Sequence, residues 1–453
     1  MQTRLHIIEF VWHDLGDWLN CYGRSEVRSP NVDSIAQNGV LFENHFCTAP
    51  QCSPSRATIK TGRYPQSHGV LGLTHRGWSY NEDERDWADV LGEHGYHTVL
   101  CGFQHERAHG SGSLSYHESI SDTNYAEPAS DAARRYIESW SGDKPLFMSI
   151  GFSEVHRPYG NEYSKETAAA LTVPGYLPDV PVVRKDCATL CTNIQRADAA
   201  VGRVLQTLEE SGMRDNTLII FTTDHGPGFP RAKMTLYDPG VKVAFLMQLP
   251  GVLPAGRRVS ALTSHVSVFP TVLDLAGIPV PERVQGRSFA QLAKGETDHG
   301  EDHVFAQMTW HAEYDPMRCI RTRRFKYIRN YRPGWPVRIG GHYTQRYGTD
   351  FVTEHFGQCR PAEELYDLES DPWEQTNCAD DPRFATEKKA LAARLERWMQ
   401  DVDDPILRGH VPPANPARAR GKALWGKFPP RDPVHDDFRV EAILFKEFNE
   451  DPV

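Results

Sequence analysis

The sequence predicts an α/β protein in which a largely parallel central sheet is sandwiched by helices and followed by a smaller α+β domain. Three observations support this fold class. Short apolar runs alternate with helical patterns over the first two thirds of the chain, and such alternation is typical of a parallel sheet covered on both faces. The pattern then changes near residue 300. The length of 453 residues allows two or three domains, so we predict an α/β domain at residues 1–298 and a smaller domain at residues 299–453.

The predicted strands are short apolar runs bounded by polar or turn residues. They cover residues 6–12, 97–102, 145–152, 216–223 and 241–248. Between them, apolar residues recur with helical spacing at residues 32–37, 88–94, 130–141 and 184–210. Because ligands of such sheets bind beyond the carboxyl ends of the strands, we expect functional residues just after the runs that end at Trp12 and Thr223.

The last third of the chain has a different pattern. Residues 322–330 are strand-like, a loop rich in Gly, Tyr and His follows to residue 360, and residues 385–400 have the spacing of an amphipathic helix. A Pro-rich tail begins near Pro405. These features predict the smaller α+β domain.

Composition and charge narrow the function classes. The 50 basic and 60 acidic residues give a net charge of −10, and the basic residues are dispersed, which argues against a nucleic-acid-binding surface. No apolar run is long enough to cross a membrane, and the chain opens without a signal-peptide pattern, so we expect a cytoplasmic protein with no membrane partner. The nine cysteines include no CxxC pair, and we expect Cys187 and Cys191 to be buried core thiols.

The most informative segment is PQCSPSRATIKTGR at residues 50–63. We predict that Ser53 caps a helix that starts at Pro54 and ends at Gly62. Cys52 would then lie at the amino end of this helix, where free N–H groups, the helix dipole and Arg56 favour a tetrahedral anion. Taken only as a cysteine before a helix, Cys52 fits a structural role about as well as a functional one.

Two acidic pairs follow predicted strands. His13 and Asp14 come after the first strand, and Asp224 and His225 come after the fourth. The two pairs are far apart in sequence, but they can converge at one edge of a parallel sheet. A single strand-end Asp-Gly is more often a turn than a metal ligand, whereas two such pairs together with Cys52 favour a metal site.

The runs CSPSR at residues 52–56 and TGR at residues 61–63 resemble the signature of the sulfatases of the alkaline phosphatase superfamily. Within that family the chain is most similar to the N-sulfoglucosamine sulfohydrolases. The resemblance implies an alkaline phosphatase-like fold and the oxidation of Cys52 to formylglycine by a maturation enzyme. One hydroxyl of the hydrated aldehyde then attacks sulfur, and the other expels sulfate by collapsing to the aldehyde.

The resemblance also implies the residues of the site. The catalytic positions that match are Cys52, Arg56, His105, His156 and Lys233, and the metal-ligand positions are His13, Asp14, Asp224 and His225. The implied ion is calcium, with manganese and magnesium as alternatives. His13 stands where the family usually has an aspartate, and imidazole ligands suit a transition ion better than calcium.

Phe103 stands where the family usually has a sulfate-binding lysine. Gln104 is a candidate to replace that contact, and Lys60 lies one helical turn beyond Arg56. In the smaller domain, we expect His311, Glu313 and Arg318 to contact the sugar of a small sulfated saccharide substrate.

Three functions stay open from the sequence. The first is a sulfatase that cleaves an N-sulfate or an O-sulfate of a carbohydrate. The second is a phosphodiester or phosphonate monoester hydrolase, since related proteins share the metal site and the nucleophile. The third is a non-catalytic protein that binds sulfated glycans, which would follow if Cys52 were never matured. A homo-oligomer is compatible with each of them.

Overall fold

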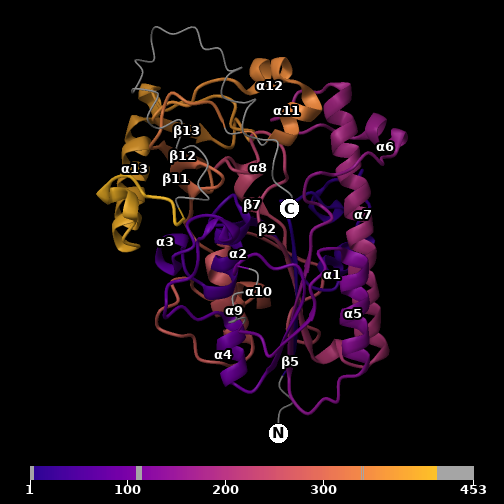
Figure 1. Cartoon of the computed structure of the whole chain (residues 1–453). Helices are drawn as coiled ribbons and strands as arrows, with labels where there is room; N and C mark the ends of the chain where they lie inside the picture. The colour runs from indigo at the N-terminus through magenta and orange to yellow at the C-terminus, as the bar shows by residue number, and fades with distance from the viewer. Residues whose placement is uncertain (1–4, 109–114, 338, 340, 416–453) are drawn as a thin grey trace.

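A computed structural model describes residues 5–108, 115–337, 339 and 341–415. The chain forms a nine-stranded sheet and a four-stranded sheet, with helices on both faces of the larger one (Figure 1). The order in the larger sheet is β4-β3-β5-β1-β6-β8-β2-β7, and β9 pairs with β2. The predicted α/β fold class with a smaller C-terminal α+β domain is therefore confirmed.

One half of the large sheet is parallel, as predicted. It consists of β4 (Glu118–Ser121), β3 (His97–Gly102), β5 (Leu146–Phe152), β1 (His6–Trp12) and β6 (Thr217–Thr223). Strands β5 and β6 are buried along their whole length, because both faces are covered by helices. The carboxyl ends of β1 and β6 consequently lie side by side at one edge.

The other half of the sheet is mixed. It contains β8 (Phe245–Gln248), β2 (Val40–Phe46), β7 (Lys242–Val243) and β9 (Arg257–Ser264). Strand β8 runs antiparallel to β6, and β9 runs parallel to β2. The strand predicted at residues 241–248 is present but begins at Lys242 and is interrupted at Ala244. The helix α8 (Asp238–Val241) ends at Val241, and the N–H of Ala244 donates to the carbonyl of Gly16, 3.0 Å away.

Two helical layers cover the large sheet (Figure 1). One face carries α1 (Pro30–Gln37), α5 (Ala126–Glu138) and α7 (Pro181–Glu210). The other face carries α2 (Cys52–Thr61), α4 (Trp87–Glu93), α9 (Val268–Leu275) and α10 (Ala290–Lys294). Cys187 and Cys191 are buried in the first of these cores, as predicted. Short helices α3 (Pro65–His68) and α6 (Lys165–Ala170) lie in connections.

The smaller sheet is antiparallel and belongs to the last third of the chain. Its strands are β10 (His303–Trp310), β11 (Tyr314–Thr322), β12 (Phe325–Asn330) and β13 (Glu363–Asp367). The predicted amphipathic helix is α13 (Ala385–Asp401), which packs Trp398 and Met399 against this sheet. The domain boundary between residues 298 and 299 stays a prediction.

The segment before β13 corrects the sequence analysis. It was expected to be a loop, but it contains α11 (Gly341–Tyr347) and α12 (Thr349–Phe356). Tyr343, Val352 and Phe356 are buried against the large core, so tertiary packing stabilises helices that the Gly-rich composition disfavours. Of the Pro-rich tail, residues 416–453 lie outside the described residues.

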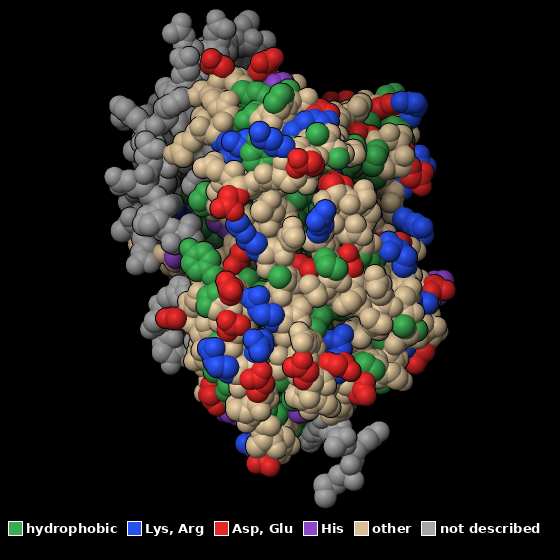
Figure 2. Space-filling model, turned by 90° about the vertical axis from the view of Figure 1, so that its right-hand side faces the viewer, with side chains coloured by type: hydrophobic (Ala, Val, Ile, Leu, Met, Phe, Trp, Pro, Cys, Tyr) green, Lys and Arg blue, Asp and Glu red, His purple; other side chains and the backbone are tan. Residues whose placement is uncertain are grey.

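Two general features complete the fold. None of the helices within the described ranges combines the length and the apolar character needed to cross a membrane. On the face shown in Figure 2, basic and acidic side chains are interspersed over the surface.

Candidate active site

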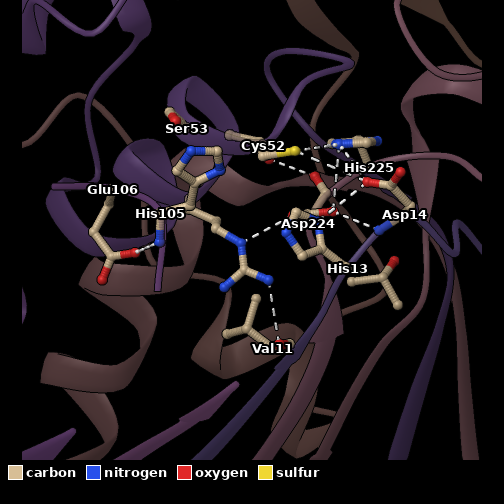
Figure 3. Close-up of polar contacts among 12 residues, drawn as sticks. Val11, His13, Asp14, Cys52, Ser53, His105, Glu106, Asp224 and His225 are labelled. Carbon is tan, nitrogen blue, oxygen red and sulfur yellow. Dashed lines mark hydrogen bonds and ion pairs between the residues drawn. The ribbon is translucent and has the colours of Figure 1, made fainter. Parts of the chain in front are cut away.

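Five residues that can bind a metal converge where the ends of β1 and β6 meet the start of α2 (Figure 3). One ligand atom from each lies within 4.8 Å of those of all the others, and all five residues are buried. These residues are His13, Asp14, Cys52, Asp224 and His225. The structure thus brings together the two strand-end pairs and the cysteine that the sequence analysis singled out.

Helix α2 supplies the cysteine from its first turn. It begins at Cys52, two residues earlier than predicted, and Gln51 occupies the N-cap position. Ser53 is therefore not the cap, and its hydroxyl instead accepts the N–H of Thr74 at 3.1 Å. Gly62 ends the helix in the left-handed conformation, as predicted. All ten residues of α2 are buried.

The two imidazoles face the two carboxylates. His13 Nδ1 lies 3.1 Å from both Asp14 Oδ1 and Asp224 Oδ2. His225 Nε2 lies 3.1 Å from Asp14 Oδ1 and 3.5 Å from Asp224 Oδ1. His225 Nδ1 is 2.9 Å from the carbonyl of Gly226, so its N–H donates there and the Nε2 lone pair is directed at the carboxylates. Metal-binding histidines usually have this arrangement, and the donor set therefore fits a divalent cation.

Backbone contacts hold the two strand ends together. The N–H of Asp14 donates to Asp224 Oδ1 at 2.9 Å, and the N–H of Gly16 donates to the carbonyl of His225 at 2.8 Å. Gly16 has φ of 62°, and a Cβ there would come within 3.1 Å of Pro227. The close approach of the two loops thus requires glycine at this position.

Two cations bind the outer oxygens of the carboxylates. Arg56 Nε donates to Asp224 Oδ2 at 2.9 Å, and Lys233 Nζ donates to Asp14 Oδ2 at 2.6 Å. Lys233 Nζ is also 3.8 Å from Cys52 Sγ. Burial opposes ionisation of the Cys52 thiol, but the charges of Lys233, His13 and His225 hold its pKa well below the usual range.

His156 lies beside Lys233. Its Nε2 is 3.1 Å from Lys233 Nζ and 3.6 Å from Asp14 Oδ2, and its Nδ1 hydrogen-bonds the carbonyl of Arg157. Burial lowers the pKa of His156 to about 4, although Asp14 acts in the opposite direction. At neutral pH its Nδ1–H therefore donates to the backbone, and its Nε2 accepts a hydrogen bond from the Lys233 ammonium.

His105 lies farther out. Its ring centroid is 6.4 Å from that of His13 and 5.2 Å from that of His75, on which it stacks. His105 Nε2 is 3.0 Å from His75 Nδ1. The sequence analysis did not find His75, because nothing in its neighbourhood in the chain relates it to His105.

Phe103 fills the space between two residues of the site. Its ring centroid is 4.3 Å from that of His13, and the Arg56 guanidinium lies 4.9 Å above it. Phe103 therefore contributes an apolar ring, and no charge, to this side of the site.

Three residues suggested for substrate binding are engaged elsewhere. Both ends of the Gln104 amide bond the backbone of Arg107 at 3.1 Å. Lys60 is buried in an ion pair with Glu9 and donates to Ser149 at 3.0 Å. Arg318 is fully buried and forks onto Asp404, so the expectation that it contacts the sugar is wrong.

The other two residues of that segment lie in the turn between β10 and β11. Burial lowers the pKa of His311 to about 3, and the nearby charge of Lys233 acts in the same direction. His311 is therefore within electrostatic range of the cluster and uncharged at neutral pH. The carbonyl of Glu313 accepts the N–H of His311 at 3.1 Å.

Ser55 and His265 form a further contact that the sequence analysis missed. The Ser55 hydroxyl donates to the carbonyl of Asp224 at 2.5 Å and lies 3.1 Å from His265 Nδ1. This contact fixes the end of β6 against α2. Ser55 belongs to the signature run, but only the fold shows its partner.

A buried cysteine at a helix start, carboxylate and imidazole ligands, and flanking cations together define a hydrolase built on an α/β sheet. The model of the sulfatase family matches residues 6–278, which is more than half of the chain. The model described as N-sulphoglucosamine sulphohydrolase, C-terminal, matches residues 229–335. The chain therefore belongs to the sulfatase family, and it is a sulfatase-type hydrolase.

Several known proteins and solved structures are similar to this chain. An ulvan-active sulfatase of Formosa agariphila is 29% identical over 465 residues, covering 89% of this chain and 76% of that protein. Human N-sulphoglucosamine sulphohydrolase is 27% identical over 442 residues, covering 85% and 88%. Among solved structures, a complex with the substrate D-glucosamine-2-N,6-O-disulfate has a TM-score of 0.69 at 20% identity, covering 88% and 98%. The phosphonate monoester hydrolase of Agrobacterium radiobacter has a TM-score of 0.67 at 20% identity, covering 88% and 96%. These two structures share the fold.

Proposed function

We propose that this sulfatase releases sulfate from an N-sulfate or an O-sulfate group of a small saccharide. The reaction uses formylglycine derived from Cys52 and one divalent metal ion. The observation that carries the proposal is the position of the Cys52 sulfur. It lies in the first turn of α2, 3.4 Å from His225 Nε2 and 3.9 Å from Asp14 Oδ1. The names of the relatives, one for ulvan and one for N-sulphoglucosamine, support a sulfated carbohydrate as substrate. The maturation enzyme, the cytoplasmic location and the oligomeric state stay predictions.

The residues of the cluster have distinct tasks in this proposal. A divalent ion held by His13, Asp14, Asp224 and His225 would offset the charge of the nucleophile and of the sulfuryl oxygens. Arg56 holds Asp224 in place through its Nε, 2.9 Å from Oδ2. The hydrated formylglycine supplies one hydroxyl that attacks sulfur and a second hydroxyl that later expels sulfate. We assign the removal of the proton of this second hydroxyl to His105.

Lys233 is the better proton donor for the leaving group. Burial opposes its charge, but Asp14 raises the pKa of Lys233 above the usual range, so its ammonium persists at neutral pH. His156 is neutral at that pH and presents a lone pair to Lys233. We therefore propose that Lys233 protonates the departing oxygen or nitrogen, and that His156 orients the Lys233 ammonium.

The turn between β10 and β11 is proposed to contact the sugar. His311 lies in this turn, and burial together with the charge of Lys233 lowers its pKa to about 3. A neutral imidazole can both donate to and accept from sugar hydroxyls. We propose that His311 and Glu313 contribute to the choice of saccharide.

Replacement of Cys52 tests the proposed function. Cys52→Ala should abolish sulfate release, measured by ion chromatography, and should leave the thermal unfolding midpoint nearly unchanged. Cys47→Ala is the matched control, because Cys47 is also buried and lies outside the cluster. Mass spectrometry of the tryptic peptide should find the lighter aldehyde form of residue 52 in active protein. Sulfate release by Cys52→Ala would contradict the proposal.

A second candidate is a phosphonate monoester or phosphodiester hydrolase. The observation that favours it is Phe103, which leaves the site without the cation that sulfatases usually place there. The value of kcat/KM should be measured for a sulfate ester and a phosphonate ester of the same phenol. A higher value for the sulfate supports the sulfatase, and a higher value for the phosphonate supports the alternative.

A further inference from the structure

We infer that the metal site selects a divalent first-row transition ion, such as Mn²⁺, over Ca²⁺. This inference rests on the proposed function, and it names the class of ion that the site takes. It is carried by the number of oxygen atoms that the carboxylates leave available and by the positions of the two imidazole rings against those carboxylates.

The cluster has few oxygen atoms for calcium. Within the described part of the chain, its carboxylates are those of Asp14 and Asp224. Asp14 Oδ2 accepts from Lys233 at 2.6 Å, and Asp224 Oδ2 accepts from Arg56 at 2.9 Å. Each carboxylate therefore has one oxygen held by a cation, which opposes bidentate binding of an ion. Calcium takes about six to eight oxygen ligands from carboxylates, carbonyls and water, and bidentate carboxylates help to reach that number.

Two neighbouring polar side chains in the described part of the chain, Gln104 and Ser55, are engaged elsewhere. The Gln104 amide is engaged with the backbone of Arg107 at both ends. The Ser55 hydroxyl is held between the carbonyl of Asp224 and His265. Even the free oxygen Asp224 Oδ1 accepts the N–H of Asp14 at 2.9 Å.

Imidazole nitrogens of His13 and His225 face the carboxylates of the cluster. His225 Nε2 faces Asp14 Oδ1 at 3.1 Å, and the other nitrogen of His225 is bound to the carbonyl of Gly226. His13 Nδ1 lies 3.1 Å from each carboxylate. The His13 ring is packed between Phe103 and His156, with centroids 4.3 and 4.8 Å away, so it is fixed in this orientation. Imidazole is a poor ligand for calcium and a good one for first-row transition ions.

Phe103 thus acquires a role in this inference. It stands beside His13 and under Arg56, and its apolar ring excludes a side-chain oxygen from that side of the cluster. The two departures from the family pattern, at residues 13 and 103, are in contact with each other. Together they place an imidazole, held against a phenyl ring, at this corner of the cluster.

The test is a measurement of metal content and metal affinity. Protein purified without chelator should contain a transition ion by mass spectrometry of the elements. After the ion is stripped, calorimetric titration should give a Kd for Mn²⁺ at least about 100-fold lower than the Kd for Ca²⁺. The titration is repeated on Cys52→Ala, so that the sulfur atom does not contribute to the preference. Equal affinities, or tighter binding of Ca²⁺, would overturn the inference.

Two variants locate the selectivity. His13→Asp should shift the ratio of the two Kd values toward Ca²⁺ by about tenfold or more, because it replaces an imidazole by a carboxylate. His45→Asn is the matched control, since His45 is equally buried but hydrogen-bonds Thr263 outside the cluster, and its ratio should equal that of the wild type. If His13→Asp does not fold, His13→Asn should lose affinity for Mn²⁺ more than for Ca²⁺. An unchanged ratio in the folded His13 variant would contradict the inference.

Spectroscopy distinguishes this inference from the proposed function. Pulsed electron paramagnetic resonance of the Mn²⁺ protein should show coupling to two imidazole nitrogens, and one of them should disappear in the His13 variant. A protein that holds Ca²⁺ and releases sulfate would overturn the inference but leave the proposed function intact. A protein that holds Mn²⁺ but releases no sulfate would do the reverse.

Discussion

Buried carboxylates occur in two regions of this chain, and the groups that surround them differ. Asp186 on α7 is fully buried. It accepts from Arg157 and from the hydroxyl of Tyr347 at 2.5 Å, and it forms an ion pair with Arg346, whose Nε lies 2.5 Å away. Every partner of Asp186 is a protein donor. Asp14 also has a protein donor, Lys233, but its other oxygen faces Nε2 of His225.

The difference shows how a functional carboxylate can be told from a structural one. Around Asp186 each acceptor meets a donor, so the group is complete as it stands. At the end of β1, acceptor atoms face each other, and they require a proton or a metal ion between them. Burial alone does not separate the two cases, because both carboxylates are buried.

The largest expected effect is the loss of turnover when Asp14 is replaced. Asp14→Asn should lower kcat by roughly 10³-fold or more, because it removes a charged ligand and the partner of Lys233. Metal content should fall with it. Asp198→Asn is the control, since Asp198 is also buried but caps α1 through the N–H of Val32 at 2.8 Å, and it should keep its turnover. Equal losses in both variants would mean that the two regions do not differ in the way described.

Replacement of Asp186 should instead lower stability and leave metal content unchanged. Asp186→Asn should lower the free energy of unfolding by about 3–5 kcal/mol, because it leaves Arg157 and Arg346 without a buried counterion. Urea unfolding at equilibrium measures this loss. Metal content should stay at the wild-type level. Asp198→Asn, on the same helix, should cost only about 1 kcal/mol, as expected for a helix cap. A loss of metal from Asp186→Asn would contradict the comparison.

The pH dependence of the metal-free protein sharpens the contrast. Burial opposes the charge of His225, but Asp224 and Asp14 raise its pKa to about 10. This pKa is above the unfolded value, so the histidine stabilises the metal-free fold fully below about pH 6.5, and the contribution is lost as the pH rises toward 10. Metal binding displaces the proton, so affinity should rise with pH over the same window.

Urea unfolding of metal-free protein at several pH values checks the sign. The wild type should lose stability between about pH 6.5 and 10 relative to His225→Asn, which lacks the titrating imidazole. Metal-saturated protein should not show this loss. A metal-free wild type that gains stability relative to His225→Asn over this range would exclude the proposed charge state.

The smallest effect is expected at the turn between β10 and β11. His311→Ala should raise KM about 3- to 10-fold with little change in kcat, because it removes a neutral hydrogen bond worth about 0.5–1.5 kcal/mol. Arg318 lies in β11, seven residues after His311. Arg318→Lys should instead lower the unfolding free energy and leave KM unchanged, since Arg318 is fully buried against Asp404. A rise of KM in Arg318→Lys would restore the role first expected for that residue.

The parallel half of the sheet and the metal-binding pairs could be predicted because local signals mark them. Apolar runs end at Trp12 and Thr223, and His13 and Asp224 follow directly. Strands β2 and β9 escaped prediction because polar residues interrupt their apolar pattern, as in the run ENH at residues 43–45. The apolar residues of such strands do not alternate regularly with polar ones, so the sequence shows no clear strand period.

The misassigned residues share a different cause. Arg318 and Lys60 are charged residues whose partners, Asp404 and Glu9, are distant in the chain. A sequence shows a charge but not the counterion that the fold brings to it. Gln104 failed for a local reason, because its amide closes its own loop with Arg107. The helices α11 and α12 depend on tertiary packing that composition does not reveal.

The burial of α2 has a consequence for the biogenesis of the enzyme. Cys52 is 3% exposed, and every residue of its helix is covered by the rest of the fold. A second protein could not bind this segment once the chain has folded. If Cys52 is converted to formylglycine as proposed, its oxidation would have to precede folding, while the segment is still extended. The oxidising enzyme would then compete with the folding of the chain. Mutations that merely hasten folding would then leave more molecules permanently inert.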